Sequence, residues 1–385
     1  MKYIKYCIGI IAFLALYACK DKEKSLLEPK VYFEKAQQKL KVGENVNSYE
    51  FNITARLTDI TGENVNVTYQ IGDAQMVADY NAKNETKYRM MPAENFSLER
   101  NSATIKSGTI YAEPCKLVLR NLSAIGEGST YVVPVTIVDA SLPTVEAKTT
   151  FIEVTKPIVI NKVMNFNGKF LSIPMPTNAK FNSLTYEALI YVDNFVLLST
   201  VMGAEGNLIL RFGDTTVDAE QIQIAGNVQF NPAMKFVTGK WYHVAFVFNG
   251  ASKLAEIFVD GEKVAEKTAS VSSFNLTGPF FIGYAYDYDP NRIWRGKMSE
   301  CRIWNVARTA SQLKNNRLGV DPNSEGLFGY WKLNGTDSYE KNGVYYIKDQ
   351  SKNKLDATSR YGRYSGGAGP STQPDIVNLR VDIAD

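Results

Sequence analysis

Two acidic residues are the first candidates for chemistry in this sequence. Asp218 and Glu220 are separated by one residue, so on an extended strand both carboxylates would lie on the same face. Glycoside hydrolysis needs a pair of carboxylates held about 5–10 Å apart. No third acid follows this pair, and the stretch around it has little strand character. We interpret it as a solvated loop, which makes a hydrolytic site the minority hypothesis.

The single histidine, His243, lies between Tyr242 and Val244 in a strand-like run. A catalytic triad would also need a nucleophile, and the sequence contains no G-x-S-x-G turn. We therefore expect His243 to have a structural role. Without a C-x-x-C or H-E-x-x-H pattern, the sequence also offers no zinc site.

Alternating tyrosines form the main candidate for binding. If the backbone is extended, Tyr284, Tyr286 and Tyr288 share one face at steps of roughly 6.6 Å. Exposed aromatic rings pack against the apolar faces of sugars, and polar side chains at the edge reach the hydroxyl groups. The alternative is that the tyrosines cover the edge of a sheet and that Trp294 packs in the core. The carbohydrate-binding candidates are Tyr284, Tyr286, Asp287, Tyr288 and Trp294, with Tyr361 and Tyr364 as a second group.

Composition narrows the class of protein. A chain of 385 residues has room for two or three domains. Its net charge of +3 falls to about +1 if Lys2 and Lys5 leave with an export signal, so nucleic acid is not an expected partner. Of the four cysteines, Cys115 and Cys301 are expected to be buried thiols rather than a disulfide.

The N-terminus has the pattern of an export signal. Lys2 and Lys5 precede an apolar run over residues 8–17, which is too short to span a bilayer as a helix. The ending Leu16-Tyr17-Ala18-Cys19 resembles the lipobox of bacterial lipoproteins. This resemblance implies that residues 1–18 are removed and that Cys19 is lipidated. The alternative is an ordinary secretory signal with an incidental cysteine.

The charged run that follows Cys19 resembles the surface-export signal of Bacteroidetes-type lipoproteins. It implies a lipid-anchored protein on the outer face of the outer membrane. Residues 19–28 are charged and polar, and we expect them to act as a tether between the lipid and the first domain.

Short runs of period two recur along the chain and predict an all-β protein. Asp260-Gly261 predicts a tight hairpin, because these residues tolerate positive φ angles. Residues 73–95 break the strand rhythm and predict a short helix closed by Pro92. A domain boundary is expected at Pro157. The predicted strands are residues 49–57, 65–71, 116–120, 131–138, 241–248, 255–259 and 299–304.

The N-terminal half resembles a domain of unknown function that stands at the front of Bacteroidetes-type surface lipoproteins and of some surface endoglycosidases. The resemblance rests on Asp79-Tyr80-Asn81, Phe96-Ser97-Leu98 and Tyr131-Val132-Val133-Pro134-Val135. It implies an immunoglobulin-like β-sandwich over residues 29–157.

The C-terminal half resembles concanavalin-A-like, laminin-G-like domains. The motifs are Trp241-Tyr242-His243-Val244-Ala245, the run over residues 294–304 and Gly329-Tyr330-Trp331. They imply a jelly roll of two curved antiparallel sheets over residues 158–385, with Trp241, Trp304 and Trp331 in its core. Related domains often bind calcium, and here the oxygen-rich turn offers Asp349, Ser351, Asn353 and Asp356 as ligands. The alternative for that turn is a plain loop.

These expectations favour a non-catalytic, surface glycan-binding lipoprotein of a glycan-utilisation system. Its expected partners are an oligosaccharide and neighbouring outer-membrane glycan-uptake proteins. One alternative is a protein-docking module, which predicts a broad apolar patch. The other is an atypical glycoside hydrolase, which needs two acids facing each other across a cleft.

Overall fold

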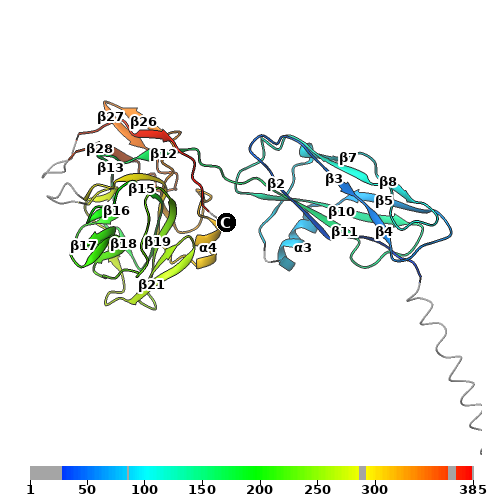
Figure 1. The fold of residues 1–385 in the computed structure, drawn as a ribbon, viewed down its shortest axis with the longest axis horizontal. Helices are drawn as coiled ribbons and strands as arrows, with labels where there is room; N and C mark the ends of the chain where they lie inside the picture. Colours follow the sequence, from blue (N-terminus) through cyan, green and yellow to red (C-terminus); the bar gives the residue numbers. More distant parts are fainter. Residues whose placement is uncertain (1–27, 85, 286–291, 363–369, 384–385) are drawn as a thin grey trace, which may run out of the picture. The chain divides into compact units, whose positions relative to one another are not determined.

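The computed structural model describes residues 28–84, 86–285, 292–362 and 370–383. These residues form two compact units, one ending at Pro157 and the other beginning at Ile158. Strands dominate both units, which confirms the all-β prediction (Figure 1). In the described part of the chain, none of the helices has the length and apolar character needed to cross a membrane.

The N-terminal unit packs two sheets and a short strand pair around one core. Its larger sheet has the order β2-β11-β10-β5-β8 with β6 beside β10, the smaller sheet has the order β3-β9-β7, and β1 pairs with β4. In β5, Val65, Val67 and Tyr69 point into the core while the residues between them are more exposed, which is the alternation the sequence predicted. The strands are β1 Val31–Phe33, β2 Gln37–Lys41, β3 Tyr49–Ile53, β4 Ala55–Leu57, β5 Val65–Ile71, β6 Arg89–Met90, β7 Phe96–Leu98, β8 Ser102–Ile105, β9 Cys115–Leu119, β10 Thr130–Ala140 and β11 Thr149–Thr155.

Helix α3 (Ala74–Asn84) lies within the segment where the sequence predicted a helix. Its end differs from the prediction, because the helix stops at Asn84 instead of continuing to Pro92. The Asn81 side chain accepts a hydrogen bond from the backbone N–H of Tyr88 and donates one to its carbonyl, which turns the chain toward β6. Pro92 instead precedes a single 3-10 turn, η1 (Ala93–Asn95).

The C-terminal unit is a sandwich of two eight-stranded sheets in the described part (Figure 1). Sheet I has the order β21-β20-β19-β15-β24-β12-β29 with β25 beside β24, and sheet II has the order β18-β17-β16-β23-β13-β28-β27-β26. A further short pair joins β14 and β22. The strands are β12 Lys162–Asn165, β13 Lys169–Ile173, β14 Lys180–Phe181, β15 Ser183–Val192, β16 Ser199–Ala204, β17 Leu208–Asp214, β18 Val217–Gly226, β19 Trp241–Asn249, β20 Leu254–Val259, β21 Glu262–Thr268, β22 Phe274–Asn275, β23 Phe280–Ile282, β24 Gly296–Trp304, β25 Leu327–Trp331, β26 Ser338–Lys341, β27 Val344–Ile347, β28 Ala357–Tyr361 and β29 Asp375–Asn378.

The central strands of sheet I are buried on both faces, as β15 and β19 show in their nearly unbroken burial. Their inner face joins the main core between the sheets. The outer face is covered by α4 (Ala310–Asn315), whose Leu313 packs against Ala245 and Val247. The C-terminal segment covers another part, where Val381 packs against Trp241.

Cys115 and Cys301 are free and buried, one in each unit, which confirms that part of the sequence analysis. Burial raises the pKa of both thiols, and Cys301 is affected more strongly. Both side chains therefore act as small apolar residues in their cores.

The predicted hairpin is present between β20 and β21. Asp260 has φ 53° and Gly261 has φ 87°, as a tight two-residue turn requires. The turn also lies against α4, because a Cβ built on Gly261 would be 2.7 Å from Cβ and 2.8 Å from Cα of Lys314. A second turn of the same kind joins β26 to β27, where Gly343 has φ 76° and nothing within 4 Å of a built Cβ.

These two glycines make a matched test of how the turn positions α4. We expect Gly343→Ala to lower the free energy of unfolding by about 1–2 kcal/mol, because a side chain is unfavourable on left-handed backbone. Gly261→Ala should cost a further ~1–3 kcal/mol, because the new methyl group overlaps the helix backbone. Urea denaturation of both variants measures the difference. Equal losses would show that the contact with Lys314 relaxes freely.

Candidate functional site

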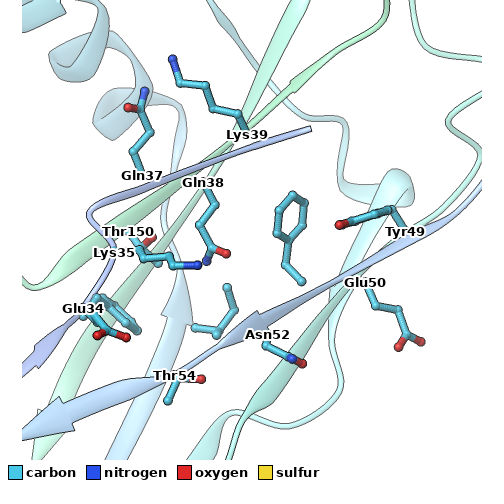
Figure 2. A pocket seen from close by; sticks show the side chains of 13 residues that line it. Glu34, Lys35, Gln37, Gln38, Lys39, Tyr49, Glu50, Asn52, Thr54 and Thr150 are labelled. Atoms are coloured by element: carbon cyan, nitrogen blue, oxygen red, sulfur yellow. The ribbon is translucent and has the colours of Figure 1, made fainter. Parts of the chain in front are cut away.

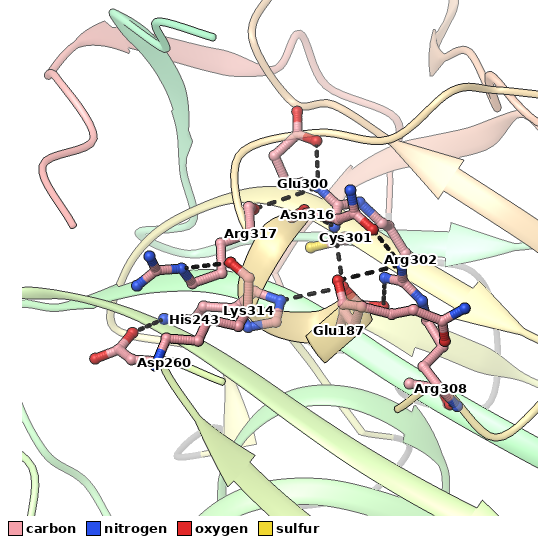
Figure 3. A network of polar contacts seen from close by, with 12 residues as sticks. Glu187, His243, Asp260, Glu300, Cys301, Arg302, Arg308, Lys314, Asn316 and Arg317 are labelled. Atoms are coloured by element: carbon pink, nitrogen blue, oxygen red, sulfur yellow. Dashed lines mark hydrogen bonds and ion pairs between the residues drawn. The ribbon is translucent and has the colours of Figure 1, made fainter. Parts of the chain in front are cut away.

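The outer face of sheet I holds a buried ionic network (Figure 3). Its centre is the Glu187 carboxylate on β15, which is fully buried. One oxygen, Oε1, accepts a hydrogen bond from Nη1 of Arg308 at 2.6 Å. The other, Oε2, accepts one from Nη1 of Arg302 at 2.9 Å and lies 3.1 Å from Nε2 of His243. Two segments that lie far from β15 in the sequence, one at His243 and one at residues 302–308, therefore converge on one carboxylate.

The network continues toward the end of α4. Arg302 is 2.6 Å from Glu300 Oε2, and this carboxylate also accepts a hydrogen bond from the Tyr330 hydroxyl. Arg302 donates to the carbonyl of Asn316, the residue that follows α4, and Arg308 donates to the Asn316 side chain. These bonds fix the segment around α4 on the sheet. Glu187, His243 and Arg302 are fully buried, which agrees with the structural role expected for His243.

Protonation of Glu187 is strongly disfavoured. Burial by itself raises the pKa of this carboxyl group, but the hydrogen bond with His243 and the positive charges of Arg302 and Arg308 outweigh burial and lower it to about 2. An acid catalyst at neutral pH needs the opposite shift. The network therefore serves stability rather than chemistry.

Sheet II presents the more open outer face. Its core-facing residues include Leu171 and Ile282, so their neighbours along each strand point outward. The strand register aligns the outward residues in one row across the sheet. That row contains Gly203, Phe281, Ser172, Thr358, Tyr346 and Tyr339.

The middle of this outer face is covered by a small aromatic cluster. Tyr284, one of the predicted sugar-binding residues, is fully buried there with its ring centroid 4.8 Å from Phe170 and 5.7 Å from Phe281. Trp294 is 1% exposed and lies in the main core, 5.6 Å from Phe212. A buried ring has no free face for a sugar, so the predictions for Tyr284 and Trp294 are wrong.

Of the remaining predicted sugar-binding residues, only Tyr361 lies in the described part of the structure. Tyr286, Asp287, Tyr288 and Tyr364 lie outside the described residues. Tyr361 is 52% exposed at the end of β28, and its ring is so close to Gly168 that a Cβ there would be 2.7 Å from Cε2. Tyr361 therefore stays a candidate at the rim of sheet II.

Two further tyrosines on sheet II were missed in the sequence. Tyr339 and Tyr346, here called the tyrosine pair, are half-buried on β26 and β27 with stacked rings 5.2 Å apart. The Tyr339 hydroxyl donates to Asp356 at 2.7 Å, and this bond, together with partial burial, raises the pKa of Tyr339 to about 12. The turn at Asn342-Gly343, with a tyrosine-bearing run on each side, was the signal that could have revealed the pair.

The acids near the opposite end of sheet II are engaged in ion pairs. Asp214 pairs with Arg211, and Glu205 pairs with Arg292. Asp218 is 2.5 Å from the ammonium group of Lys235. The loop predicted for Asp218 and Glu220 is wrong, since both lie in strand β18, although its ladder with β17 shifts register there, between the pair of Phe212 with Ile222 and the pair of Asp214 with Val217. Their strand character was hidden because the local residues are mostly polar.

The predicted calcium ligands lie in a turn whose polar groups form hydrogen bonds with neighbouring protein groups. The two Asp349 oxygens accept hydrogen bonds from the backbone N–H groups of Tyr330, Ser351 and Leu355 and from the Ser351 hydroxyl, at 2.7–2.8 Å. Asp356 accepts from the Asp349 N–H, and the Asn353 side chain donates to the Phe328 carbonyl. Within the described residues, no cluster of three or more acidic, histidine or cysteine side chains could hold a metal. These residues do not fit a calcium ion, and the plain-turn alternative holds.

Comparisons with known proteins define the class. Residues 27–144 match a family of N-terminal domains, and residues 167–314 match the concanavalin A-like lectin/glucanases superfamily. The expected pairing of these two domains is thereby confirmed. No curated protein sequence matches the chain.

A solved structure of a candidate carbohydrate binding protein from Bacteroides ovatus ATCC 8483 matches both units. The two chains are 33% identical with a TM-score of 0.77, and the match covers 92% of this chain and 100% of that one. This chain therefore belongs to the same two-domain family as the Bacteroides ovatus protein.

More distant matches cover parts of the chain. The SAP-like pentraxin of Limulus polyphemus is 16% identical over 41% of this chain and 81% of that chain, with a TM-score of 0.31. EndoBT-3987 of Bacteroides thetaiotamicron, solved with a Man5GlcNAc product, is 20% identical over 33% of this chain and 30% of that chain, with a TM-score of 0.27. These scores are too low to support an argument about this chain.

The buried network predicts a defined response to mutation and to pH. Glu187→Gln should lower the free energy of unfolding at neutral pH by about 3–5 kcal/mol, because Arg308 is left buried without a counter-charge and Arg302 keeps only Glu300. The matched control, Glu266→Gln, removes an exposed pair with Lys263 and should cost less than about 1 kcal/mol.

The pH dependence follows from the lowered pKa of Glu187. Its stabilising contribution is complete above the ordinary value of 4.5 and is lost as pH falls through about 2. Denaturant titrations from neutral pH to about pH 3 should show a steeper loss in the wild type than in Glu187→Gln. Parallel pH curves for the two proteins would contradict this assignment.

Proposed function

We propose that this chain is a non-catalytic protein that binds glycans at the bacterial cell surface. Its family includes a candidate carbohydrate binding protein, and its C-terminal unit has a fold shared by lectins and glucanases. Fold alone does not decide between binding and catalysis, so the proposal depends on the side chains of the open face.

The tyrosine pair is the observation that carries the proposal. Tyr339 and Tyr346 lie in one row with Ser172 and Thr358, so aromatic rings and hydroxyl groups share a face. Arg360, two residues beyond Thr358 on β28, also points outward from this sheet. Aromatic rings flanked by polar groups are the chemistry that a sugar ring requires. Sheet I offers no comparable surface, because α4 and the C-terminal segment cover its central strands.

Binding without catalysis fits the state of the acids on sheet II. A glycosidase needs one carboxyl group with a raised pKa and a second one opposite it. In the described part of this face, Glu205 and Asp214 are each engaged in an ion pair with an arginine. These carboxylates are therefore poor candidates for a general acid.

Protein docking is less well supported. Docking through an apolar surface needs a contiguous patch of several hundred Å². The large exposed apolar side chains of the C-terminal unit, as far as it is described, come from separate segments: Leu197, Val237, Val306 and Tyr361. Such scattered residues are normal on a soluble surface.

The proposal includes a lipid anchor on Cys19 and a surface location in the outer membrane. It is supported by the basic, apolar and Ala18-Cys19 pattern of residues 1–19 and by the charged run that follows. A lipid-anchored protein on the outer face of the membrane does not by itself import a glycan. We therefore place the protein beside outer-membrane glycan-uptake proteins, to which it presents captured glycans.

Tyr346→Ala tests the binding face. Loss of one stacking ring should weaken glycan retention about tenfold, which corresponds to about 1.4 kcal/mol. Stability should change little, because the ring is only half-buried. Affinity electrophoresis in gels containing candidate polysaccharides measures the retention. Tyr111→Ala, which removes an exposed tyrosine from the N-terminal unit, is the control and should migrate as the wild type does.

Cys19→Ser tests the anchor. It should abolish incorporation of labelled fatty acid and release the protein from the membrane fraction, because one thioether-linked lipid is removed with the cysteine. Cys7→Ser is the matched control within the signal and should leave lipidation unchanged. Membrane retention of Cys19→Ser without lipid label would contradict the assignment.

A further inference from the structure

The N-terminal unit contains a cavity of about 540 Å³ between strands β2 and β3 (Figure 2). Each of these strands is the last in its sheet, so the cavity opens along two unpaired strand edges. Its volume lies within the range of small-molecule sites, about 300–1,000 Å³. The residues that define its chemistry are Phe33, Lys35, Gln38, Tyr49, Phe51 and Thr150.

A buried hydroxyl group without a partner lines this cavity. Thr150 is 1% exposed, and in the described structure its Oγ1 has no hydrogen-bond partner. The neighbouring Thr149, on the opposite face of β11, shares a hydrogen bond of 2.9 Å with Thr136. Valine would fill the place of Thr150 at lower cost, since a buried unpaired hydroxyl destabilises the fold. The unpaired hydroxyl therefore points to a ligand.

Among the described charged residues that line the cavity, all but Lys35 are in ion pairs. Glu34 pairs with Arg56, Glu50 with Lys116, and Lys39 with Glu153, all at 2.8–3.2 Å. Lys35 has no ion pair with any described residue. Figure 2 shows its ammonium group and the Gln38 amide extending into the space between the two strands. Three hydrogen-bond donors, from Lys35, Gln38 and Thr150, thus line one cavity.

An aromatic wall completes the cavity. Tyr49 is 42% exposed and its ring lies 4.9 Å from that of Phe51 in an edge-to-face arrangement. The floor is formed by Phe33, Phe51 and Ile53, which belong to the core of the unit. An apolar ring face can pack there while its polar edge reaches the donors.

From these observations we infer that the cavity binds a sugar unit that carries a carboxylate, such as a hexuronic acid. The carboxylate pairs with the Lys35 ammonium group, and ring hydroxyls bond to Gln38 and Thr150. The apolar face of the ring packs on Tyr49. An extended peptide along the open edges of β2 or β3 would need neither the buried hydroxyl nor the cation. This site is separate from the open face of sheet II and does not depend on it.

The test uses the full mature chain and a pair of probes that differ in one group. Isothermal titration with methyl β-D-glucuronide should show binding at least about tenfold tighter than with methyl β-D-glucoside, because only the former carries the charge for Lys35. Lys35→Met should abolish this difference. Equal binding of both probes, or binding of neither, would overturn the inference.

Thr150→Val and Thr149→Val are the matched variants. Thr150→Val should weaken glucuronide binding about fivefold while the melting temperature stays equal or rises, because an unpaired hydroxyl is removed. Thr149→Val should keep the affinity and lower the melting temperature, because Thr136 loses its partner. Unchanged affinity in Thr150→Val would contradict the site. If Thr150→Val loses glucuronide binding but still binds a glycan at sheet II, the proposed function is unaffected, because the two sites are tested separately.

Discussion

The C-terminal unit depends on one buried carboxylate, Glu187. It lies on the central strand of sheet I and is bonded by Arg302 from the adjacent strand, by Arg308 from the segment before α4, and by His243 from the strand on its other side. Fully buried charges are tolerated only when each has a partner of opposite charge. Removing one partner leaves an uncompensated charge in an interior of low dielectric constant. The arginines of the network also bond to Asn316, which fixes the segment around α4 on the sheet.

The burial of the outer face of sheet I limits where a ligand can bind. The outer face of sheet I is occupied by the network, by α4 and by the C-terminal segment, so its central strands are buried on the outside as well as on the inside. Sheet II has its middle covered by Tyr284 and its aromatic neighbours, but the strands that carry the tyrosine pair stay partly open. The same sandwich thus buries the outer face of one sheet and leaves part of the other open, where the proposal places the glycan.

Local patterns in the sequence identified much of the fold but little of the site. Period-two runs and the turn at Asp260-Gly261 predicted strands correctly, because each is fixed by residues close in the chain. Tyr284 and Trp294 were misjudged, since their burial depends on packing against distant strands. The partners of Glu187 escaped notice for the same reason, because Arg302 lies 115 residues away. The cavity beside Thr150 likewise exists only once separate strands meet.

The central claim is that the protein holds glycans without cleaving them. The most direct measurement begins with binding of the mature chain to an array of bacterial and host glycans. The chain is then incubated in solution with each glycan that it bound, and the masses of the products are measured by mass spectrometry. Our account predicts reproducible binding to at least one glycan class, with the glycan mass unchanged. Release of shorter saccharides, or an absence of binding to every glycan on the array, would contradict it.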